Sequence, residues 1–595
     1  MRLVAGHGPN IKAMFNRVTT LLPYLKRYQR YLWIGLATVA AHNALRLAAP
    51  MVLRRAVDGL REGMTVAAIW WYAGLVVGLA LAAGIFLFLM RRTVIWASRK
   101  MEYDLRGDLF AHLLKLPPSF FDRTPTGEIL SRASTDIDAI RMMLGPGIMY
   151  SANALVVGAG AIPFMFYLDW QLALYTLVPL PILSLAVNRL GAMVHRQFTA
   201  IQKHFALISA HTQESLAGIR VVKSGAHEHL RHEQFTRLND EYFALNMKLI
   251  RTQGLFHPLL YFLAGIAVVA VVYFGGRSVI DGRISLGSFV AYTLYLAMLI
   301  WPMIALGWVV SMYQRGTASL ARIDQIFAER SDIADRAGPS AGGHFTGDIV
   351  INNLTFAYPG TARPVLNNMT LHIPAGHTLA LLGATGSGKT TVLRLLTRAY
   401  PLPDKTIFID GHDINIIPLT RLRALFGVVG QEPFLFSSTL AENFSFGLDK
   451  VSSLEKLVEL GDTAGILGEI EELPTAWDTI IGERGITLSG GQKQRVSLAR
   501  ALAVRPVILL LDDAFSSVDT QTEEHILDRL ARYSSGRTVV LVSHRVSTAR
   551  RADCIAVMAD GKIAESGTHD ELIAHDGPYA ALVEKQALQE QLAAI

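Results

Sequence analysis

The sequence predicts an all-α membrane domain of six helices fused to a soluble α/β domain. Of its 595 residues, 51% are hydrophobic and 18% are charged, and the mean hydropathy is +0.32, whereas a soluble protein carries about 25% charged residues. Long uncharged runs crowd the region before Ser311, and the sequence after Gly343 has the composition of a soluble protein. At roughly 100 to 200 residues per domain, the length allows about three to five domains.

Six segments have the ~20 mostly apolar residues that a helix needs to cross a bilayer core about 30 Å thick. Five of them contain no Asp, Glu, Lys or Arg, and the first contains Arg46. In chain order the segments are residues 31–53, 69–90, 145–168, 170–187, 254–276 and 286–313. A lipid bilayer is therefore a predicted partner of residues 31–328.

Lys and Arg are distributed unequally between the two sides of these spans. We number the segments outside the spans in chain order, beginning with the N-terminal segment. The odd-numbered connections, 1–30, 91–144 and 189–253, contain six, nine and nine such residues. The even-numbered connections, 54–68, 169 and 277–285, contain three, none and two. Because cytoplasmic loops are enriched in Lys and Arg, both termini are predicted to be cytoplasmic. The first 30 residues lack the features of a removable signal peptide and are expected to remain as a cytoplasmic segment.

The two long cytoplasmic connections continue in helix-forming sequence, so the spans are expected to extend beyond the bilayer. Prolines and a glycine interrupt the first connection at 117–128, which leaves room for a short crosswise helix. Gly218 marks a similar elbow at 214–223. Each elbow is either a docking site for the soluble domain, which we favour, or a simple turn between helices.

Arg46 interrupts the first span and has two interpretations. A charged side chain inside a bilayer normally faces protein or a water-filled cavity, so Arg46 could line a transport cavity. It lies seven residues before the end of the span, about 10 Å at 1.5 Å per residue. Its guanidinium could therefore reach the headgroups instead.

Residues 329–346 are rich in Ser, Pro and Gly and predict a linker, and residues 347–595 form the predicted soluble domain. In this domain an apolar strand at 379–382 leads into a glycine-rich loop and then a helix. The loop reads Gly383-Ala384-Thr385-Gly386-Ser387-Gly388-Lys389-Thr390, and the predicted helix is 391–396. Thr391, its first residue, is also expected to bind the nucleotide. Strand, loop and helix in this order predict a phosphate-binding loop, with Lys389 on the β and γ phosphates and Thr390 on Mg²⁺.

A second apolar strand, at 507–511, ends at Asp512 and Asp513. Asp512 is placed to complete the magnesium shell, and Asp513 is placed to orient the attacking water. Between the two strands lies the run Leu488-Ser489-Gly490-Gly491-Gln492. This run matches the signature of ATP-binding cassette (ABC) proteins without a substitution, so the chain resembles that superfamily.

The other parts of the resemblance occur in the order usual for these proteins. Tyr358 matches the aromatic residue that stacks on adenine, and Gln431 matches the glutamine that senses Mg²⁺ and the membrane domain. Residues 516–519 match the loop that crosses to the opposite subunit. His544 matches the switch histidine, and 483–485 resemble an exporter-type loop.

With six spans N-terminal to one cassette, nearly the whole chain resembles a half-size ABC exporter. The resemblance implies ATP and Mg²⁺ as cofactors, a small hydrophobic substrate, and the bacterial plasma (inner) membrane. It also implies a second half-transporter chain, because the signature around Ser489 is useful only against a γ-phosphate held by another cassette.

Asp513 departs from the glutamate that usually follows the magnesium aspartate. Its carboxylate is one methylene shorter, and a misplacement of ~1 Å can cost on the order of 100-fold in rate. We therefore expect this site to hydrolyse ATP slowly and favour a heterodimer, as in the A-type subunit of multidrug-resistance-like pairs. A homodimeric lipid or drug flippase is the alternative.

Other functional classes fit the sequence less well. The net charge of +7 would suit a nucleic-acid partner, but membrane proteins collect Lys and Arg beside anionic lipid for independent reasons, so no nucleic acid is expected. Six spans disfavour a non-transporting cassette ATPase. A channel or sensor on the same scaffold would differ from a pump by lacking ATP-dependent flux.

Overall fold

The computed structural model describes residues 18–335, 343–482, 485 and 488–593. The chain divides into two compact units. The N-terminal unit contains residues 1–114 and 125–329, and the C-terminal unit contains 115–124 and 330–595. Of the predicted first elbow, residues 117–124 therefore group with the C-terminal unit and residues 125–128 with the N-terminal unit.

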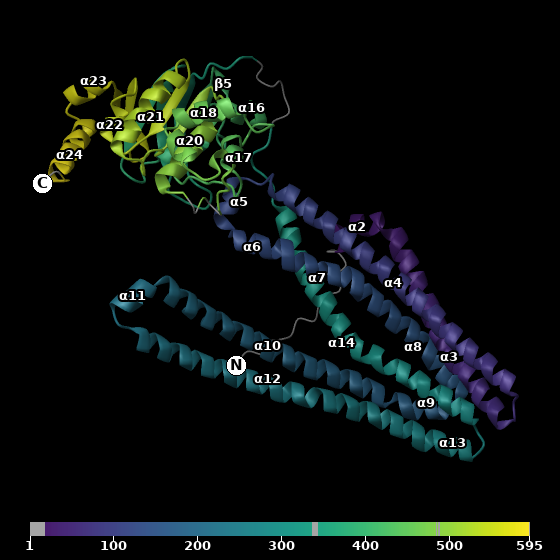
Figure 1. The fold of residues 1–595 in the computed structure, drawn as a ribbon. Coiled ribbons are helices and arrows are strands. Elements are labelled where there is room, and N and C mark those ends of the chain that lie inside the picture. Colours follow the sequence, from purple (N-terminus) through teal and green to yellow (C-terminus); the bar gives the residue numbers. More distant parts are fainter. Residues whose placement is uncertain (1–17, 336–342, 483–484, 486–487, 594–595) are drawn as a thin grey trace. The chain divides into compact units, whose positions relative to one another are not determined.

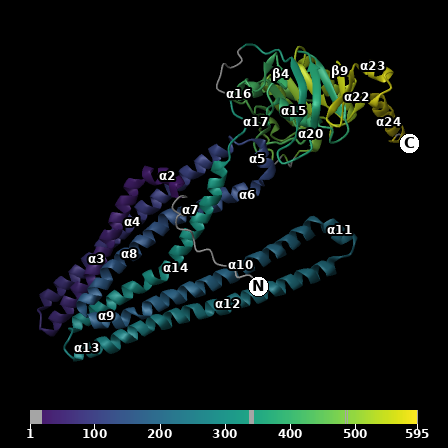
Figure 2. The same cartoon turned by 180° about the vertical axis from the view of Figure 1, so that it is seen from behind.

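The described part of the N-terminal unit is helical throughout. Its α-helices are α2 (Leu22–Arg27), α3 (Gln29–Arg61), α4 (Val66–Leu113), α6 (Thr126–Ser131), α7 (Ile137–Met142), α8 (Ile148–Leu168), α9 (Trp170–Leu177), α10 (Pro179–Ala217), α11 (Ile219–Ser224), α12 (Glu228–Ala270), α13 (Gly276–Ile280) and α14 (Leu286–Ala328). Short 3₁₀ or π-helical turns occupy Val18–Leu21, Arg132–Asp136, Met143–Gly147 and Val271–Gly275. Helices α10 and α12 run side by side to α11, and this end of the pair lies apart from α4 and α7 (Figures 1 and 2).

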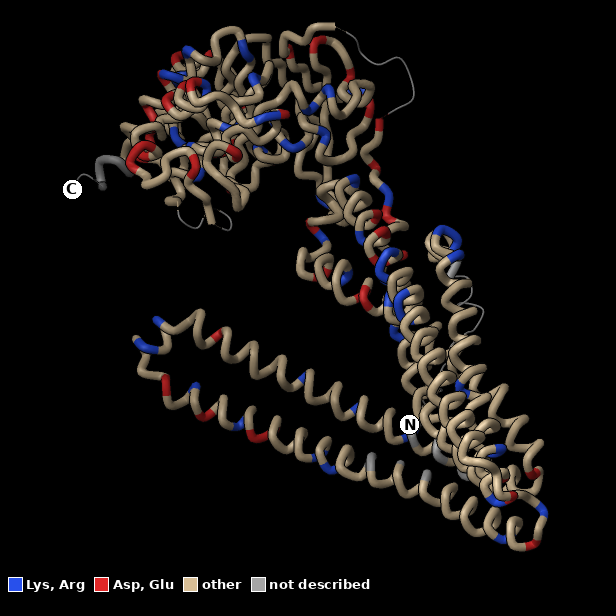
Figure 3. The backbone as a smooth tube through the Cα atoms, turned by 45° about the vertical axis from the view of Figure 1, so that its right-hand side comes forward, with Lys and Arg blue, Asp and Glu red and all other residues tan. Residues whose placement is uncertain are grey.

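Among the described residues, five helical segments are long and apolar enough to cross a membrane. They are Gln29–Arg61, Val66–Leu113, Thr126–Leu168, Tyr261–Ile280 and Leu286–Ala328. Lys, Arg, Asp and Glu, which Figure 3 marks along the backbone, are absent from residues 66–90, 142–168 and 286–314 of these segments. The remaining predicted span, 170–187, covers α9 and the beginning of α10, which meet at Val178, and it stays a prediction.

The helices extend beyond a bilayer as the sequence predicts. Helix α4 has 48 residues, which is about 70 Å at 1.5 Å per residue. Outside the spans its buried Glu102 contacts Arg99 at 2.9 Å, Arg106 at 2.8 Å and Arg141 of α7 at 3.5 Å. A buried carboxylate is stable only when it is paired in this way, so the contact with Arg141 helps to fix α7 against α4.

The core of the membrane-spanning part lies between α3, α8, α9 and α14. Tyr292 and Tyr295 of α14 are fully buried there. The Tyr295 hydroxyl donates a 2.7 Å hydrogen bond to the Leu47 carbonyl of α3. Asn43 is also buried and donates to the Asn153 side-chain oxygen of α8 at 3.0 Å. These bonds satisfy polar groups that would be costly to leave unpaired.

The described part of the C-terminal unit contains two sheets. The order of the first is β2 (Leu366–Ile373), β1 (Ile349–Phe356), β4 (Ile407–Ile409), β5 (His412–Asp413), and it is antiparallel. The order of the second is β10 (Lys562–Gly567), β9 (Cys554–Ala559), β3 (Thr378–Gly383), β8 (Thr538–Val542), β7 (Ile508–Asp512), β6 (Phe426–Val429). In the second sheet only β10 is antiparallel to its neighbour.

Helices cover both faces of the second sheet. The helices of this unit are α5 (Pro118–Arg123), α15 (Lys389–Leu396), α16 (Leu419–Ala424), α17 (Leu440–Phe444), α18 (Leu454–Thr463), α19 (Leu467–Glu471), α20 (Gly490–Ala503), α21 (Thr520–Tyr533), α22 (Val546–Ala549), α23 (His569–Ala574) and α24 (Pro578–Ala593). Alternate residues of β7 point into different cores, since Leu510 packs on one face and Leu509 and Leu511 pack on the other. A parallel strand buried on both faces reads as a continuous apolar run, which explains the sequence of β7.

The described parts of the predicted linker are attached to the C-terminal unit. The Arg398 guanidinium donates to the Ala334 carbonyl at 3.1 Å, and the Leu419 N–H donates to Asp335 at 2.7 Å. Phe345 is buried in the core of the same unit. The connection to α14 is thus held by the soluble domain on both sides of residues 336–342.

Candidate nucleotide site

The parallel strands β3, β8 and β7 are neighbours in the second sheet and end at the same edge of it. Asp512 pairs with Val542 in register, and Leu381 pairs with the same residue from the other side. Segments that follow parallel strands meet at this carboxyl edge, where ligands of such sheets bind. A cavity of about 350 Å³ lies there, lined by Tyr358, Val365, Thr385, Gly386, Gly388, Lys389, Thr390, Thr391, Gln431, Asp512, Asp513, Val542 and His544.

The glycine-rich loop joins β3 to α15 through backbone conformations that favour glycine. Gly383 has a φ of 144°, and a Cβ there would lie 2.4 Å from the Met558 carbonyl oxygen. Gly388 has a φ of 105°, and a Cβ there would lie 2.7 Å from Leu366. Side chains at these two positions would force the loop away from its neighbours. The first turn of α15 therefore begins beside the cavity, with N–H groups suited to phosphate.

Lys389 is the first residue of α15, and its ammonium group points back over the loop. Its Nζ donates hydrogen bonds to the Gly383 carbonyl at 2.7 Å and the Ala384 carbonyl at 2.9 Å. Burial lowers the pKa of Lys389, and the nearby carboxylates of Asp512 and Asp513 oppose this effect. A buried cation at the cavity wall is suited to an anionic ligand such as a polyphosphate.

Thr390 and Asp512 form the donor set for a metal ion. The Thr390 hydroxyl donates to the Asp512 Oδ1 at 3.1 Å. Burial raises the pKa of Asp512, and the bond from Thr390 opposes this effect. Within the described ranges, no group of three or more His, Cys, Asp or Glu could hold a metal by itself. The pair fits Mg²⁺, which binds through one or two protein oxygens together with substrate phosphates and water.

Asp513 follows β7 and has a φ of 50°. Its N–H donates to the Val542 carbonyl at 3.0 Å, and its carbonyl accepts from the Gln494 amide at 3.4 Å. These bonds orient the residue so that it lines the cavity together with Gln431 and His544. Asp tolerates the left-handed region better than most residues. Besides Asp512 of the metal position, the cavity thus contains a second carboxylate, that of Asp513, and one histidine, His544.

Tyr358 also lines the cavity. Its hydroxyl is 3.0 Å from the Thr391 hydroxyl. Its ring packs edge-on against Tyr400 at 5.1 Å between centroids and against Phe356 at 5.2 Å. Two aromatic neighbours and a hydrogen bond hold the ring in place, which suits a residue that stacks on a base.

The signature does not line this cavity. Ser489 caps α20, since its hydroxyl accepts from the Gln492 N–H at 3.2 Å and its own N–H donates to Gln492 at 2.8 Å. Gly491 has no room for a side chain, because a Cβ would lie 2.7 Å from the Ser517 carbonyl. Leu488 is partly buried and Gly490 is exposed. The residues 488–492 therefore form a separate surface at the N-terminus of a 14-residue helix.

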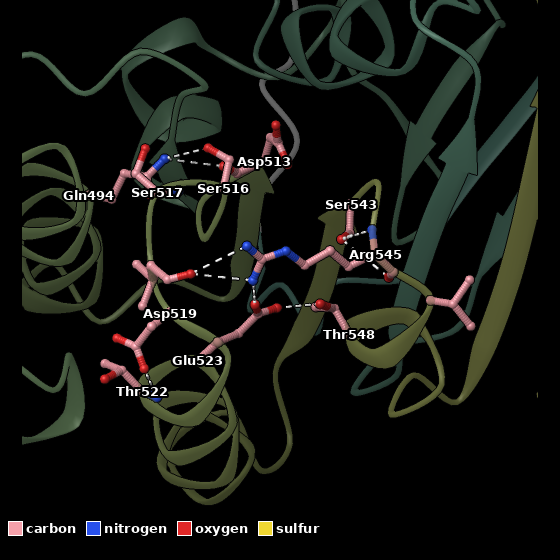
Figure 4. A network of polar contacts seen from close by, with 12 residues as sticks. Gln494, Asp513, Ser516, Ser517, Asp519, Thr522, Glu523, Ser543, Arg545 and Thr548 are labelled. Carbon is pink, nitrogen blue, oxygen red and sulfur yellow. Dashed lines mark hydrogen bonds and ion pairs between the residues drawn. The ribbon is translucent and has the colours of Figure 1, made fainter. Parts of the chain in front are cut away.

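A polar network that the sequence analysis missed joins residues 516–519 to the segment after β8 (Figure 4). Glu523 is buried and accepts from both Arg545 and the Thr548 hydroxyl. The Arg545 guanidinium also donates to the Val518 carbonyl at 3.3 Å. Gln494 of α20 donates to the Ser516 hydroxyl at 2.8 Å. A buried carboxylate four residues after Asp519 carries no recognisable sequence pattern, so only the structure identifies it.

Tyr400, which the sequence analysis did not single out, contacts the predicted first elbow. The Tyr400 hydroxyl donates a 2.6 Å hydrogen bond to Asp122 of α5, and burial together with this bond raises the pKa of Tyr400 to about 12. Tyr400 therefore remains a donor at neutral pH. Arg46 is exposed, which both interpretations of this residue accommodate. Glu483 and Arg484 of the exporter-type loop lie outside the described residues.

Comparison with known proteins agrees with this architecture. Residues 32–303 match the family described as ABC transporter transmembrane region, and residues 366–516 match the family described as ABC transporter. The chain is 33% identical to the probable multidrug resistance ABC transporter ATP-binding/permease protein YheI of Bacillus subtilis (strain 168), over 97% of this chain and 98% of YheI. It is 34% identical to the multidrug resistance-like ATP-binding protein MdlA of Escherichia coli (strain K12), over 96% of each chain.

A solved structure extends the likeness to the fold. A bacterial Atm1-family ABC exporter with ATP bound is 27% identical, with a TM-score of 0.78 over 94% of this chain and 98% of that one. The predicted fold class, a helical membrane domain fused to an α/β ATPase domain, is confirmed. So is the prediction of an ATPase that couples hydrolysis to transport. With both domains matched over nearly their full length, the chain belongs to the ABC transporters, as a half-size, multidrug-resistance-like exporter.

Proposed function

We propose that the chain is one half of an ATP-driven pump that moves hydrophobic or amphipathic compounds, either drug-like molecules or lipids, out of the cytoplasm or the inner leaflet. The observation that carries this proposal is the cavity that gathers Tyr358, Lys389, Asp512 and His544, in a chain whose other unit has membrane-spanning helices. YheI and MdlA are described as multidrug resistance and multidrug resistance-like proteins, which supports this substrate class.

We place the chain in the bacterial plasma (inner) membrane with both termini in the cytoplasm. The excess of Lys and Arg in the odd-numbered connections supports this orientation. The contact of Asp122 with Tyr400 supports a docking role for the first elbow. The second elbow, at α11, exposes the apolar residues Leu216, Ile219 and Val221, and we propose that it docks on the second chain.

In the proposed mechanism, Tyr358 stacks on adenine while the loop N–H groups and Lys389 bind the β and γ phosphates. Thr390, Asp512 and Gln431 would hold Mg²⁺, and the ion would supply positive charge beside the β and γ phosphates. Asp513 and His544 orient the water that attacks the γ-phosphate. Hydrolysis changes the charge at the site and so biases two arrangements of the paired domains.

A second ABC half is needed because the signature does not line the cavity of its own chain. We propose that Ser489 and the N–H groups of Gly490 and Gly491 close over a γ-phosphate bound by the partner. Tight binding of ATP between two such faces would hold the cassettes together, and loss of phosphate would release them. Alternating access of the membrane domain follows from this switch.

We further propose that the partner is a different chain. Asp513 is one methylene shorter than the usual glutamate, so its carboxylate falls short of the attacking water and this chain's own site turns over slowly. Its signature is intact and can complete a fast site on the partner. A homodimer, acting as a lipid or drug flippase, is the alternative, in which a backbone shift brings Asp513 within reach.

Two variants of the complex purified from native membranes test this assignment. Asp513→Asn should leave most of the ATPase rate intact, because the partner's site does the hydrolysis. Ser489→Arg should abolish most of it, because a bulky cation blocks closure over the partner's nucleotide. Equal losses in the two variants, or recovery of this chain without a second ABC half, would contradict the heterodimer. Substrate export is measured as ATP-dependent flux into sealed inverted vesicles, and ATPase activity without flux would contradict the pump.

A further inference from the structure

The segment that carries His544 is held from two sides after it leaves β8. On one side Arg545 pairs with Glu523 and donates to the Val518 carbonyl (Figure 4). The Ser543 hydroxyl accepts from the Arg545 N–H at 2.9 Å. On the other side lies Gln586 of α24, the last helix described.

Gln586 makes two hydrogen bonds to this segment. Its amide nitrogen donates to the His544 carbonyl, and its Oε1 accepts from the Val546 N–H at 2.8 Å. Val546 is the first residue of α22, so its N–H has no partner within that helix. A primary amide can donate and accept at once, and here it brackets the two peptide groups on either side of Arg545.

The position of Gln586 is fixed by the packing of α24. Tyr579 is fully buried, and Leu582 and Val583 pack against a core cluster that includes Ala549 of α22 and Leu382 of β3. Gln586 follows Leu582 and Val583 by four and three residues, so it lies on the same face of the helix. Its amide is therefore anchored by apolar contacts to the strand that leads into the phosphate-binding loop and to the helix that follows His544.

We propose that Gln586 is a positioning residue for the ATPase reaction and that it acts through His544. Fixing the His544 carbonyl and the Val546 N–H fixes the backbone from which the imidazole projects. Without the amide, the peptide after His544 can rotate and the imidazole moves away from the γ-phosphate position. Because a misplacement of ~1 Å can cost on the order of 100-fold in rate, turnover falls while ATP affinity is retained. This inference rests on the role proposed for His544.

The test uses the purified full-length chain in lipid, with the chain in excess over ATP so that hydrolysis at its own site is measured. Gln586→Leu removes both hydrogen bonds, and Gln586→Glu keeps the acceptor for Val546 but places a carboxylate against the His544 carbonyl. Lys585→Ala, at an exposed position of the same helix, is the matched control. Hydrogen exchange of the 543–546 backbone reports on the contact directly.

Gln586→Leu should speed amide exchange at Val546 by about tenfold, the effect of losing one hydrogen bond of ~1.4 kcal/mol. Gln586→Glu should leave that amide protected. Both variants should lower single-turnover hydrolysis by about tenfold or more, with the ATP dissociation constant within about twofold of the parent. Because Gln586→Glu is nearly isosteric, it keeps the test valid if the leucine variant folds poorly.

A second measurement separates positioning of His544 from general destabilisation. His544→Ala combined with Gln586→Leu should be no slower than His544→Ala alone, because the amide then has nothing to position. Additive losses, or Gln586 variants that match Lys585→Ala in both exchange and turnover, would overturn the proposal. If His544→Ala alone leaves hydrolysis unchanged, the role assigned to His544 is wrong, and a changed exchange rate at Val546 would then show only a structural contact.

Discussion

Asp513→Glu should raise the ATPase rate of the chain purified alone. The added methylene extends the carboxylate by about 1.5 Å along the side chain, toward the position of the attacking water. A misplacement of ~1 Å can cost on the order of 100-fold, so restoring the reach should raise turnover by about tenfold to 100-fold. The ATP dissociation constant should stay the same, because Lys389 and the phosphate-binding loop are unchanged.

The backbone at this position sets the cost of the substitution. Asp513 has a φ of 50°, and holding a residue other than glycine in that region costs about 1–3 kcal/mol, less for Asp than for Glu. A domain stable by about 5–15 kcal/mol remains folded after such a loss. Asp560 has a φ of 46° and is exposed, so Asp560→Glu is a matched control for strain without a change in the cavity.

The assay is phosphate release from the full-length chain in liposomes, with the melting temperature measured in parallel. The Asp513→Asn variant should hydrolyse ATP at the same low rate as the unmodified chain, since asparagine has no carboxylate. The reasoning is refuted if the unmodified chain alone hydrolyses ATP rapidly and Asp513→Asn abolishes that activity. If Asp513→Glu leaves the ATPase rate unchanged, the length of the side chain at this position is not the cause of the slow hydrolysis.

Substitutions at four further positions have defined outcomes. Lys389→Ala should weaken ATP binding at this chain's own site, measured by equilibrium binding, because the buried ammonium no longer faces the phosphates; unchanged affinity would contradict the assignment. Tyr358→Ala should lose about 1–3 kcal/mol of base stacking, whereas Tyr358→Phe should keep most of it. Tyr400→Phe removes the 2.6 Å bond to Asp122, about 1.5–3 kcal/mol for a charged acceptor, so flux per ATP should fall while ATP affinity is retained. Arg46→Gln should lower flux in a well-folded protein if Arg46 faces a cavity and should have little effect if it reaches the headgroups.

The sequence predicted those parts of the site that are continuous in the chain. The strand at 379–382, the glycines after it and the capping serine of the signature are all encoded locally, and the structure has β3, the loop and α20 there. Helix α15 begins at Lys389, two residues earlier than the pattern indicated. The strand predicted at 507–511 was also readable, because β7 (Ile508–Asp512) is buried on both faces and every residue before Asp512 is apolar.

Contacts between distant segments were not readable from a single sequence. Glu523 and Arg545 are ordinary charged residues in the sequence, and only folding brings them together. Gln586 lies in a helix without a marked apolar face, so its role is set by where α24 packs. The predicted span at 170–187 was defined by composition alone, which gives no information on the junction at Val178.

The placement of α5 has a consequence for synthesis of the chain. Asp122 and Tyr400 are 278 residues apart, so at ~5–20 residues per second the elbow emerges about 15 to 55 s before its partner exists. During that interval, Asp122 has no Tyr400 to bind, and the neighbouring Phe120, which is buried in the finished protein, lies in an elbow that is not yet docked. The elbow is therefore a candidate site for chaperone contact on the ribosome. A stalling sequence inserted just before residue 400 would prolong that interval and make such contacts accessible to crosslinking.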